Sequence, residues 1–223
     1  MHRQIITTAD GSRTIQLEDW NEVYHSKHGA IEEARHVFIN AGLHHVLETH
    51  ESCELSILEI GFGTGLNAFL TLLESQRNHF TINYQGVEAY PVTLDEICQL
   101  NYVVLISPQD QHIFDKLHSC NWNKKVRITS FFELTKRQQF FADITDVNQF
   151  DMIYFDAFGA RVQPELWTKH IFKKMFDSLK VNGVLVTYAA IGQVKREMIE
   201  LGFLVERLQG PPGKRHMLRA TKK

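Results

Sequence analysis

A glycine-rich turn after an apolar run constrains the fold of this chain more than any other feature. Residues 55–60 form a mostly apolar run of strand length, and Gly61, Gly63 and Gly65 follow before helical periodicity begins at Leu66. Because glycine has no Cβ, this turn lets backbone N–H groups and a helix N-terminus approach a polar or anionic ligand. The order of strand, tight turn and helix predicts the first unit of an α/β nucleotide-binding fold.

The spacing of the glycines indicates which class of ligand the turn would bind. A dinucleotide-binding turn would carry its third glycine at position 66, which is leucine here. Glu59, two residues before the first glycine, instead makes the stretch resemble the turn of doubly wound S-adenosylmethionine-dependent methyltransferases. An ordinary strand-to-helix turn that binds no ligand is the alternative.

Length and composition favour a single domain over residues 1–223. We expect residues 51–223 to form its core and residues 1–50 to form an N-terminal extension that contributes to the cofactor and substrate pocket. No apolar run reaches about 18 residues and no secretory pattern begins the chain, so we expect a cytoplasmic protein without a membrane contact. Neither the histidines nor the three cysteines show metal-ligand spacing, so no metal is expected.

The charge is unevenly distributed. Residues 161–223 carry 13 lysines and arginines against 5 acids, whereas the whole chain has a net charge of −2. This asymmetry indicates an anionic partner near the C-terminal third, and nucleic acid is one candidate. Solvated helix faces are the competing explanation.

Alternating strand and helix patterns predict a doubly wound, mostly parallel seven-stranded sheet with an antiparallel last strand. Asp10-Gly11 is typical of a tight turn between two extended segments. Helical spacing begins at Ile31, and Gly42 is the expected stop. Strand character is also expected within residues 124–143, including the Phe140-Phe141 pair.

Acidic residues at strand ends are the candidate binding and catalytic groups. Glu88 follows the second core strand, where a carboxylate accepts hydrogen bonds from ribose hydroxyls in nucleotide-binding folds. Asp156 ends a buried strand and should face the same crevice as the glycine turn. Asp143, beside Ile144, is a candidate adenine contact. Each acid has a plainer interpretation as an exposed strand-end residue or helix cap.

Six motifs in order resemble the MnmD/MnmC-type tRNA methyltransferases. They are Asp10-Gly11-Ser12, residues 24–32, residues 59–67, Asp156-Ala157-Phe158, Gln163-Pro164-Glu165-x-Trp167 and residues 210–215. The resemblance implies a class I, Rossmann-like fold and methylation of the 5-aminomethyl group of 2-thiouridine at the tRNA wobble position. It implies S-adenosylmethionine as donor and the anticodon loop of tRNA as partner. The chain resembles the free-standing form without the FAD-dependent oxidase domain, so FAD is not expected, and a separate oxidase is a possible partner.

The sequence patterns and the resemblance together give two expected sets of site residues. The expected cofactor-binding set is Tyr24, Ser26, Glu59, Gly61, Gly63, Gly65, Leu66, Asn67, Glu88 and Asp143. The expected substrate-binding set is Phe158, Gln163, Pro164, Tyr188, Lys214 and Arg215.

The chemistry gives these groups their roles. An amine must lose a proton to accept a methyl group, and the Asp156 carboxylate is the candidate proton acceptor. Phe158 and Tyr188 are candidates to stack on a flipped base, although core packing competes, and Lys214 and Arg215 are candidate phosphate contacts. The family usually continues with Ala-Pro and a lysine where this chain has residues 159–162, and Arg161 is a candidate replacement for that lysine.

Other classes of function remain open at this point. A small-molecule amine methyltransferase or aminopropyltransferase would share the fold and the strand-end acid, but would not need the basic C-terminal third. A methyltransferase of ring-bound adenine nitrogen usually carries Asn/Asp-Pro-Pro-aromatic, which differs from Asp156-Ala157-Phe158. A domain that only binds the cofactor or RNA would not need Asp156.

Overall fold

The computed structural model describes residues 2–49 and 52–223, which form two sheets. A small antiparallel sheet has the order β1-β2-β3 and a large one the order β10-β11-β9-β8-β4-β5-β7-β6. The strands are β1 (Arg3–Thr7), β2 (Arg13–Leu17), β3 (Glu22–Val23), β4 (Glu54–Ile60), β5 (Thr81–Glu88), β6 (Lys125–Thr129), β7 (Phe132–Gln138), β8 (Phe150–Phe155), β9 (Leu179–Thr187), β10 (Phe203–Gln209) and β11 (His216–Lys222).

Helices connect most of the strands of the large sheet. The α-helices are α1 (Ala30–Ala34), α2 (His45–Thr49), α3 (Leu66–Asn78), α4 (Leu94–Ile97), α5 (Tyr102–Ile106), α6 (Gln111–Ser119), α7 (Lys169–Ser178) and α8 (Gly192–Leu201). The π-helical segment η2 (Arg35–His44) joins α1 to α2. Short 3₁₀ turns are η1 (Glu18–Trp20), η3 (Pro108–Asp110), η4 (Phe141–Asp143) and η5 (Pro164–Trp167).

The large sheet confirms the predicted doubly wound class. Strands β7, β5, β4, β8 and β9 are mutually parallel, whereas β11 runs antiparallel to both β9 and β10. The expected number of seven strands was too low: eight are formed by the described residues, because β6 adds an antiparallel hairpin partner to β7 at the edge. The expected strand character of Phe140-Phe141 was also wrong, since β7 ends at Gln138 and η4 begins at Phe141.

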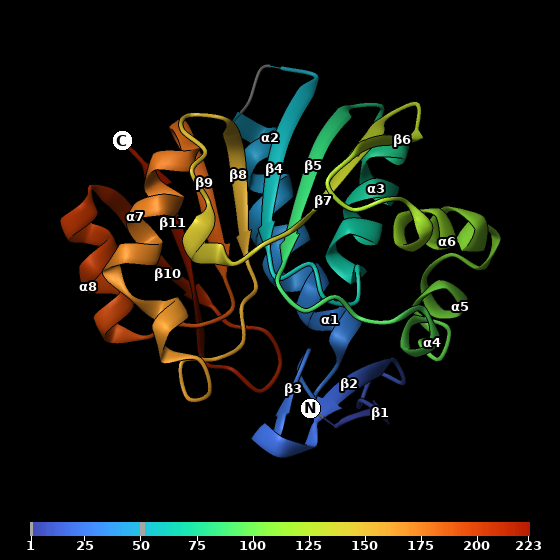
Figure 1. Ribbon diagram of the computed structural model, residues 1–223. Coiled ribbons are helices and arrows are strands. Elements are labelled where there is room, and N and C mark those ends of the chain that lie inside the picture. Colours follow the sequence, from blue (N-terminus) through green and yellow to red (C-terminus); the bar gives the residue numbers. More distant parts are fainter. Residues whose placement is uncertain (1, 50–51) are drawn as a thin grey trace.

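Each face of the sheet has its own hydrophobic core. One core contains buried side chains of η2, α3 and α6, such as Phe38, Phe69 and Phe114. The other contains Phe172 of α7 and Met198 of α8. Figure 1 shows α7 and α8 together on one side of the sheet, away from α3 and α6. Burial on both faces explains why the central strands read as apolar runs in the sequence.

Gly42 does not stop the first long helix, which continues through η2 and α2 to Thr49. A Cβ at Gly42 would lie 2.3 Å from Cε of Met152 and 3.1 Å from Cγ2 of Val186. This glycine therefore lets the helix approach the sheet closely, which is a packing role rather than a terminating one.

The N-terminal extension lies at the carboxyl ends of the parallel strands (Figure 1). Its predicted turn at Asp10-Gly11 joins β1 to β2. Oδ2 of Asp10 accepts the backbone N–H groups of Ile31 and Glu32 at 3.1 Å, and so caps α1. The Asp10-Gly11-Ser12 motif thereby fixes the first helix against the small sheet.

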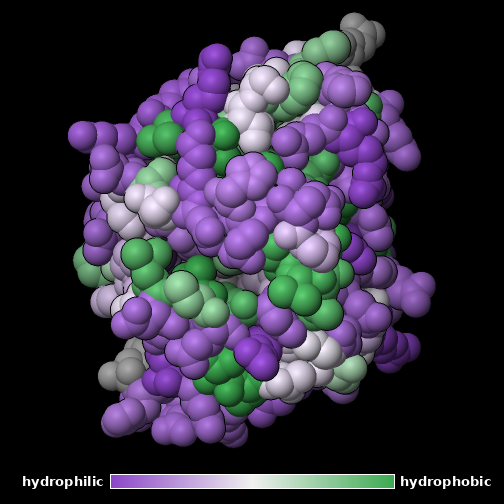
Figure 2. All heavy atoms as spheres, turned by 90° about the vertical axis from the view of Figure 1, so that its right-hand side faces the viewer, coloured by the Kyte–Doolittle hydropathy of each residue, from purple (hydrophilic) through white to green (hydrophobic). Residues whose placement is uncertain are grey.

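The face over α4, α5 and α6 is mostly hydrophilic, with hydrophobic side chains grouped in its lower half (Figure 2). The exposed large hydrophobic residues on these helices are Leu94, Val104 and Leu105. Within residues 2–49 and 52–223, no helix combines the length and apolarity needed to cross a membrane.

Candidate active site

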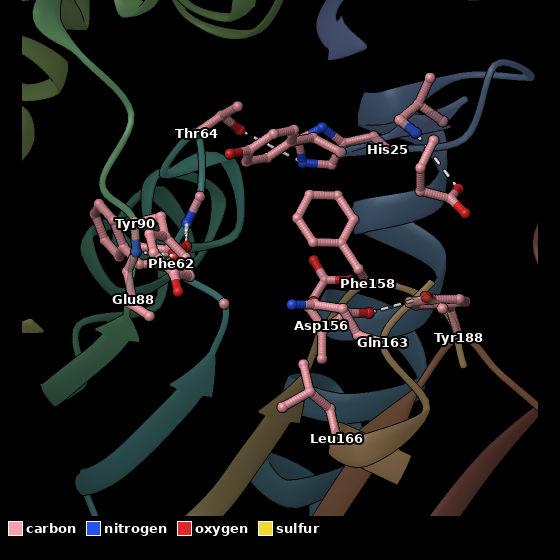
Figure 3. Close-up of a pocket in the computed structure, with 18 of the residues that line it drawn as sticks. His25, Phe62, Thr64, Glu88, Tyr90, Asp156, Phe158, Gln163, Leu166 and Tyr188 are labelled. Atoms are coloured by element: carbon pink, nitrogen blue, oxygen red, sulfur yellow. Dashed lines mark hydrogen bonds between the residues drawn. The ribbon is translucent and has the colours of Figure 1, made fainter. Parts of the chain in front are cut away.

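A cavity of about 480 Å³ opens at the carboxyl ends of β4, β5, β8 and β9. Its wall combines the glycine turn, the β5 end, the segment after β8 and the N-terminal extension. Figure 3 shows Glu88 and Tyr90 on one side of this space and Asp156, Phe158 and Tyr188 on the other. Such a crevice is where open α/β sheets bind their ligands.

The three glycines of the turn all have positive φ, and a different neighbour occupies the space of each missing Cβ. At Gly61 this Cβ would lie 2.7 Å from the Asp156 carbonyl oxygen, so the turn and the β8 end pass in backbone contact. At Gly63 the neighbour is the Tyr24 ring, and at Gly65 it is the His118 ring. The glycines thus bring parts of the protein together as well as leaving room for a ligand.

Backbone donors hold the Glu88 carboxylate in place. Its Oε2 accepts the N–H of Gly63 at 3.1 Å and its Oε1 accepts the N–H of Tyr90 at 3.0 Å. The end of β5 is therefore tied to the glycine turn, and the carboxylate lines the cavity. It keeps lone pairs for further hydrogen bonds, as a ribose-binding carboxylate requires.

Asp156 is linked to a buried acid beneath it. Nδ2 of Asn67, in the first turn of α3, donates to Oδ2 of Asp156 at 2.9 Å and to Oε1 of Glu59 at 3.0 Å. The Glu59 side chain is buried, and its Oε2 and Oδ1 of Asn67 have no hydrogen-bond partner among the described residues. Asn67 therefore connects an acid in the sheet to an acid in the cavity.

Burial shifts both acids toward their protonated forms. It raises the pKa of Glu59 well above the usual value, and the nearby Asp156 charge adds to this shift. Burial also raises the pKa of Asp156 to about 7, with the negative charge of Glu33 as the next cause. The Asn67 hydrogen bond and the Lys214 charge act in the opposite direction. Near neutral pH, Asp156 is thus able both to accept and to release a proton.

An ion pair lies in the wall beside Asp156. Nζ of Lys214 contacts Oε1 of Glu33 at 2.5 Å and lies 3.6 Å from the centre of the Tyr188 ring. The Tyr188 hydroxyl donates to the Ala157 carbonyl at 2.9 Å. Three segments far apart in the sequence, α1, the end of β9 and the β10–β11 loop, therefore meet at one point.

Aromatic rings close the cavity above Asp156. Phe158 makes edge contacts with Tyr24, at 4.9 Å between ring centres, and with Trp20, at 6.1 Å. Trp167 is buried, and its indole N–H donates to the Phe158 carbonyl at 2.7 Å. Phe158 therefore lines the cavity, whereas Trp167 supports it from the core.

Most of the predicted site residues reach this cavity. Those on its wall are Tyr24, Ser26, Gly61, Gly63, Leu66, Asn67, Glu88, Asp156, Phe158, Gln163, Tyr188 and Lys214. Those outside its wall are Glu59, Gly65, Asp143, Pro164 and Arg215. Asp143 is exposed, although its neighbours Phe141 and Ala142 line the cavity. Its expected adenine contact stays a prediction.

Two basic residues have surroundings that the sequence did not indicate. Lys214 points inward to Glu33, whereas the neighbouring Arg215 is exposed. Arg161 donates to the carbonyls of Trp20 and Asn21 and forms an ion pair with Glu22 at 2.9 Å. The segment that departs from the family pattern is thus held to the N-terminal extension by its arginine.

Two residues that shape the site, Glu33 and His25, were not predicted as site residues from the sequence. Glu33 lies on the buried face of its helix with Ala30 and Ala34, and an acid within such an apolar stripe was the available signal. His25 is buried, and its Nδ1 lies 2.9 Å from Oγ1 of Thr14. Burial lowers the pKa of His25 to about 4, so this neutral ring packs the extension onto the turn. No cluster of potential metal ligands occurs among residues 2–49 and 52–223.

Known proteins to which this chain is similar include methyltransferases. Residues 117–223 match a family model described as S-adenosyl-L-methionine-dependent methyltransferase. The chain is 26% identical over 231 residues to the tRNA 5-methylaminomethyl-2-thiouridine biosynthesis bifunctional protein MnmC of Actinobacillus pleuropneumoniae, covering 94% of the chain and 34% of that protein. It is 27% identical to the protein of the same name from Leptospira borgpetersenii, covering 89% of the chain and 32% of that protein. The chain therefore spans about a third of the length of these curated relatives.

Solved structures show the same fold. The crystal structure of MNMC2 from Aquifex aeolicus superposes with a TM-score of 0.75 at 21% identity, over 100% of this chain and 70% of that one. Spermidine synthase from Thermotoga maritima superposes with a TM-score of 0.57 at 15% identity, over 100% of this chain and 72% of that one. At these identities the likeness concerns the fold.

Proposed function

We propose that this chain, which is similar over residues 117–223 to S-adenosyl-L-methionine-dependent methyltransferases and over most of its length to MnmC proteins, methylates the 5-aminomethyl group of 2-thiouridine at the tRNA wobble position. The observation that carries the proposal is the position of Asp156, which lines the cavity against the glycine turn and accepts a hydrogen bond from Asn67 at 2.9 Å. An acid in a cleft whose pKa is raised to about 7 by burial is typical of a site that moves protons.

The cavity wall fits S-adenosylmethionine. Glu88 presents a carboxylate fixed by two backbone N–H groups, which suits ribose hydroxyls. Asn67 lines the cavity, and its amide nitrogen is held by Glu59 and Asp156. When bound, S-adenosylmethionine supplies an electrophilic methyl group on a sulfonium. The residues proposed to hold it are Tyr24, Ser26, Gly61, Gly63, Leu66, Asn67 and Glu88.

Asp156 is proposed to manage the proton of the substrate amine. An amine attacks a methyl group only as the free base. The new N–C bond forms as the bond between the methyl group and the donor sulfur breaks, so S-adenosylhomocysteine would leave as a neutral thioether and the positive charge would pass to nitrogen. The ionised Asp156 carboxylate accepts one proton from the amine and stabilises the developing charge on nitrogen. Because burial raises its pKa to about 7, the group exchanges this proton at little cost near neutral pH.

The aromatic residues near Asp156 are proposed to hold the wobble base. Phe158, Trp20 and Tyr188 line the cavity and present flat apolar surfaces. Proteins that read single-stranded RNA loops commonly stack unpaired bases on such rings. The exposed Arg215, next to this part of the wall, remains the proposed phosphate contact.

The relatives' names suggest where the substrate originates. They are called bifunctional, and this chain corresponds to about a third of their length. We propose that a flavin-dependent oxidase activity outside residues 1–223 supplies the amine. Action on tRNA would place the protein in the cytoplasm.

The direct test offers the protein labelled S-adenosylmethionine and tRNA from cells that lack this modification step. The tRNA is then digested, and we expect label in 5-methylaminomethyl-2-thiouridine. Spermidine and other free diamines are offered in parallel, because spermidine synthase shares the fold. Label in a diamine derivative and none in tRNA would replace this proposal with the small-molecule alternative.

A further inference from the structure

The charge pair beside Asp156 has features that ordinary surface ion pairs lack. The Glu33 side chain is 8% exposed and that of Lys214 is 32% exposed, whereas the partners of the Lys169–Glu200 pair are 51% and 60% exposed. Both partners line the same cavity as Asp156. Charges in such a partly desolvated place act strongly on one another and on their neighbours.

We propose that Glu33 and Lys214 are positioning residues for Asp156: their opposite charges, fixed in the cavity wall, set how readily that carboxylate takes up the proton of the substrate amine. The inference rests on the proposed function in treating Asp156 as the proton acceptor. It assigns to the pair a role beyond holding two segments together.

The surroundings of Glu33 keep its charge in place. Its Oε2 accepts the backbone N–H of Ser26 at 2.7 Å, while its Oε1 faces Lys214. The helix that carries it is capped by Asp10. Both carboxylate oxygens of Glu33 therefore have a fixed partner in the wall.

The surroundings of Lys214 fix the opposite charge. The β10–β11 loop turns back on itself through the bond from the Lys214 N–H to the Pro211 carbonyl at 2.9 Å. The ammonium then lies between the Glu33 carboxylate and the face of the Tyr188 ring, a favourable place for a cation. Because Tyr188 donates to the carbonyl of Ala157, the residue after Asp156, the pair is connected to the end of β8.

Other polar groups also surround Asp156, but they do not form a pair of opposite charges. Asn67 of α3 donates a hydrogen bond to Asp156. The buried side chains of Glu59 in β4 and Tyr84 in β5 also interact with the charge of Asp156. Tyr188 of β9 interacts with the same charge. Burial raises the pKa of both tyrosines well above the usual value, so these hydroxyls stay neutral near pH 7. The charges that oppose each other at Asp156 are therefore Glu33, which raises its pKa, and Lys214, which lowers it.

Two substitutions should move the titration of Asp156 in opposite directions. Glu33→Gln removes a negative charge and exposes Asp156 to the Lys214 cation, so the pKa of Asp156 should fall by about one unit. Lys214→Met removes the positive charge, so that pKa should rise. Lys214→Arg keeps the charge and should restore the wild-type value.

The titration is read without substrate. In protein labelled with ¹³C at the aspartate carboxyls, the Asp156 signal is identified by its absence in Asp156→Asn, and its shift is followed from pH 4 to 9. The exposed Lys169–Glu200 pair supplies the matched controls, since Lys169→Met and Glu200→Gln should leave the Asp156 midpoint unchanged. Thermal unfolding of each variant shows that it is folded.

The outcomes separate this inference from the proposed function. The proposed role of the pair is wrong if the titration midpoint of Asp156 does not change in Glu33→Gln, or if it falls in Lys214→Met. This conclusion does not depend on which substrate the enzyme methylates. If the midpoints move as expected but the pH dependence of single-turnover methylation does not follow them, the pair acts on Asp156 and the proposed role of Asp156 is what fails. Should one variant not fold, the other still decides the sign.

Discussion

The two sides of the cavity are built in different ways. The side with the glycine turn and Glu88 is held by backbone contacts, such as the Gly63 N–H on the Glu88 carboxylate. The side with Asp156 is held by side chains from distant segments, and its Glu33–Lys214 contact joins residues 181 positions apart. On the first side one carboxylate is held by two backbone N–H groups, whereas on the second side several charged and titratable side chains interact. We infer that the first holds the methyl donor and the second manages the proton.

The largest expected effect is that of Asp156→Asn, which should change proton transfer but not binding of the methyl donor. Asp156→Asn keeps the size of the side chain but removes the proton acceptor, so the single-turnover rate should fall by roughly 100-fold or more. Affinity for S-adenosylmethionine, measured by calorimetry, should change little because the donor side is intact. Asp177→Asn, at an exposed ion pair with Lys173, is the matched control and should be neutral. A normal rate in Asp156→Asn would remove this residue from the chemistry.

The same residue predicts a pH dependence. Because the pKa of Asp156 is raised to about 7, the carboxylate is mostly protonated below that pH and cannot accept the amine proton. The single-turnover rate should therefore rise about tenfold per pH unit below pH 7 and level off above it. A raised pKa also means that the folded state binds a proton more tightly than the unfolded state. The free energy of unfolding contributed by Asp156 should thus decrease as the pH rises from about 4 to about 7.

A backbone substitution tests how the two sides meet. Gly61→Ala would place a Cβ 2.7 Å from the Asp156 carbonyl oxygen at a residue with φ of +90°, so the free energy of unfolding should fall by about 2 kcal/mol. Donor affinity should fall with it. The control is Gly159→Ala, where the nearest atom to the new Cβ would be the Tyr188 hydroxyl at 3.7 Å. Equal urea unfolding curves for both variants would contradict the close backbone contact.

The contrast between the sides also explains what the sequence could reveal. The glycine spacing, Glu88 and Asp156 follow local patterns at strand ends, and the doubly wound class follows from the apolar runs. Lys214 points into the cavity because Glu33 of α1 lies there, and the packing of α1 cannot be predicted from the residues around Lys214. Gly42 illustrates the same limit, because glycine ends helices in local statistics but here admits Met152 of the sheet.

An intermediate effect is expected on the donor side. Glu88→Ala removes the proposed ribose acceptor and the support of the Gly63 N–H, so affinity for S-adenosylmethionine should fall by about tenfold. The rate at saturating donor should stay close to normal, because Asp156 is unaffected. Glu133→Ala, at a half-buried acid on β7 that pairs with Lys125 and lies outside the cavity wall, is the matched control. A lower rate with unchanged donor affinity would mean that Glu88 belongs to the other side of the cavity.

The smallest effect compares two helix caps. Asp10 caps α1, which carries Glu33, whereas Thr93 caps α4 through its Oγ1 on the N–H of Glu96. Either change to alanine should lower the free energy of unfolding by about 1 kcal/mol, measured by urea titration. Only Asp10→Ala should also lower the methylation rate at saturating donor, since loosening α1 disturbs Glu33 beside Asp156. If the two variants lose the same stability and the same activity, the contact of Asp10 with α1 does not help to position Glu33 beside Asp156.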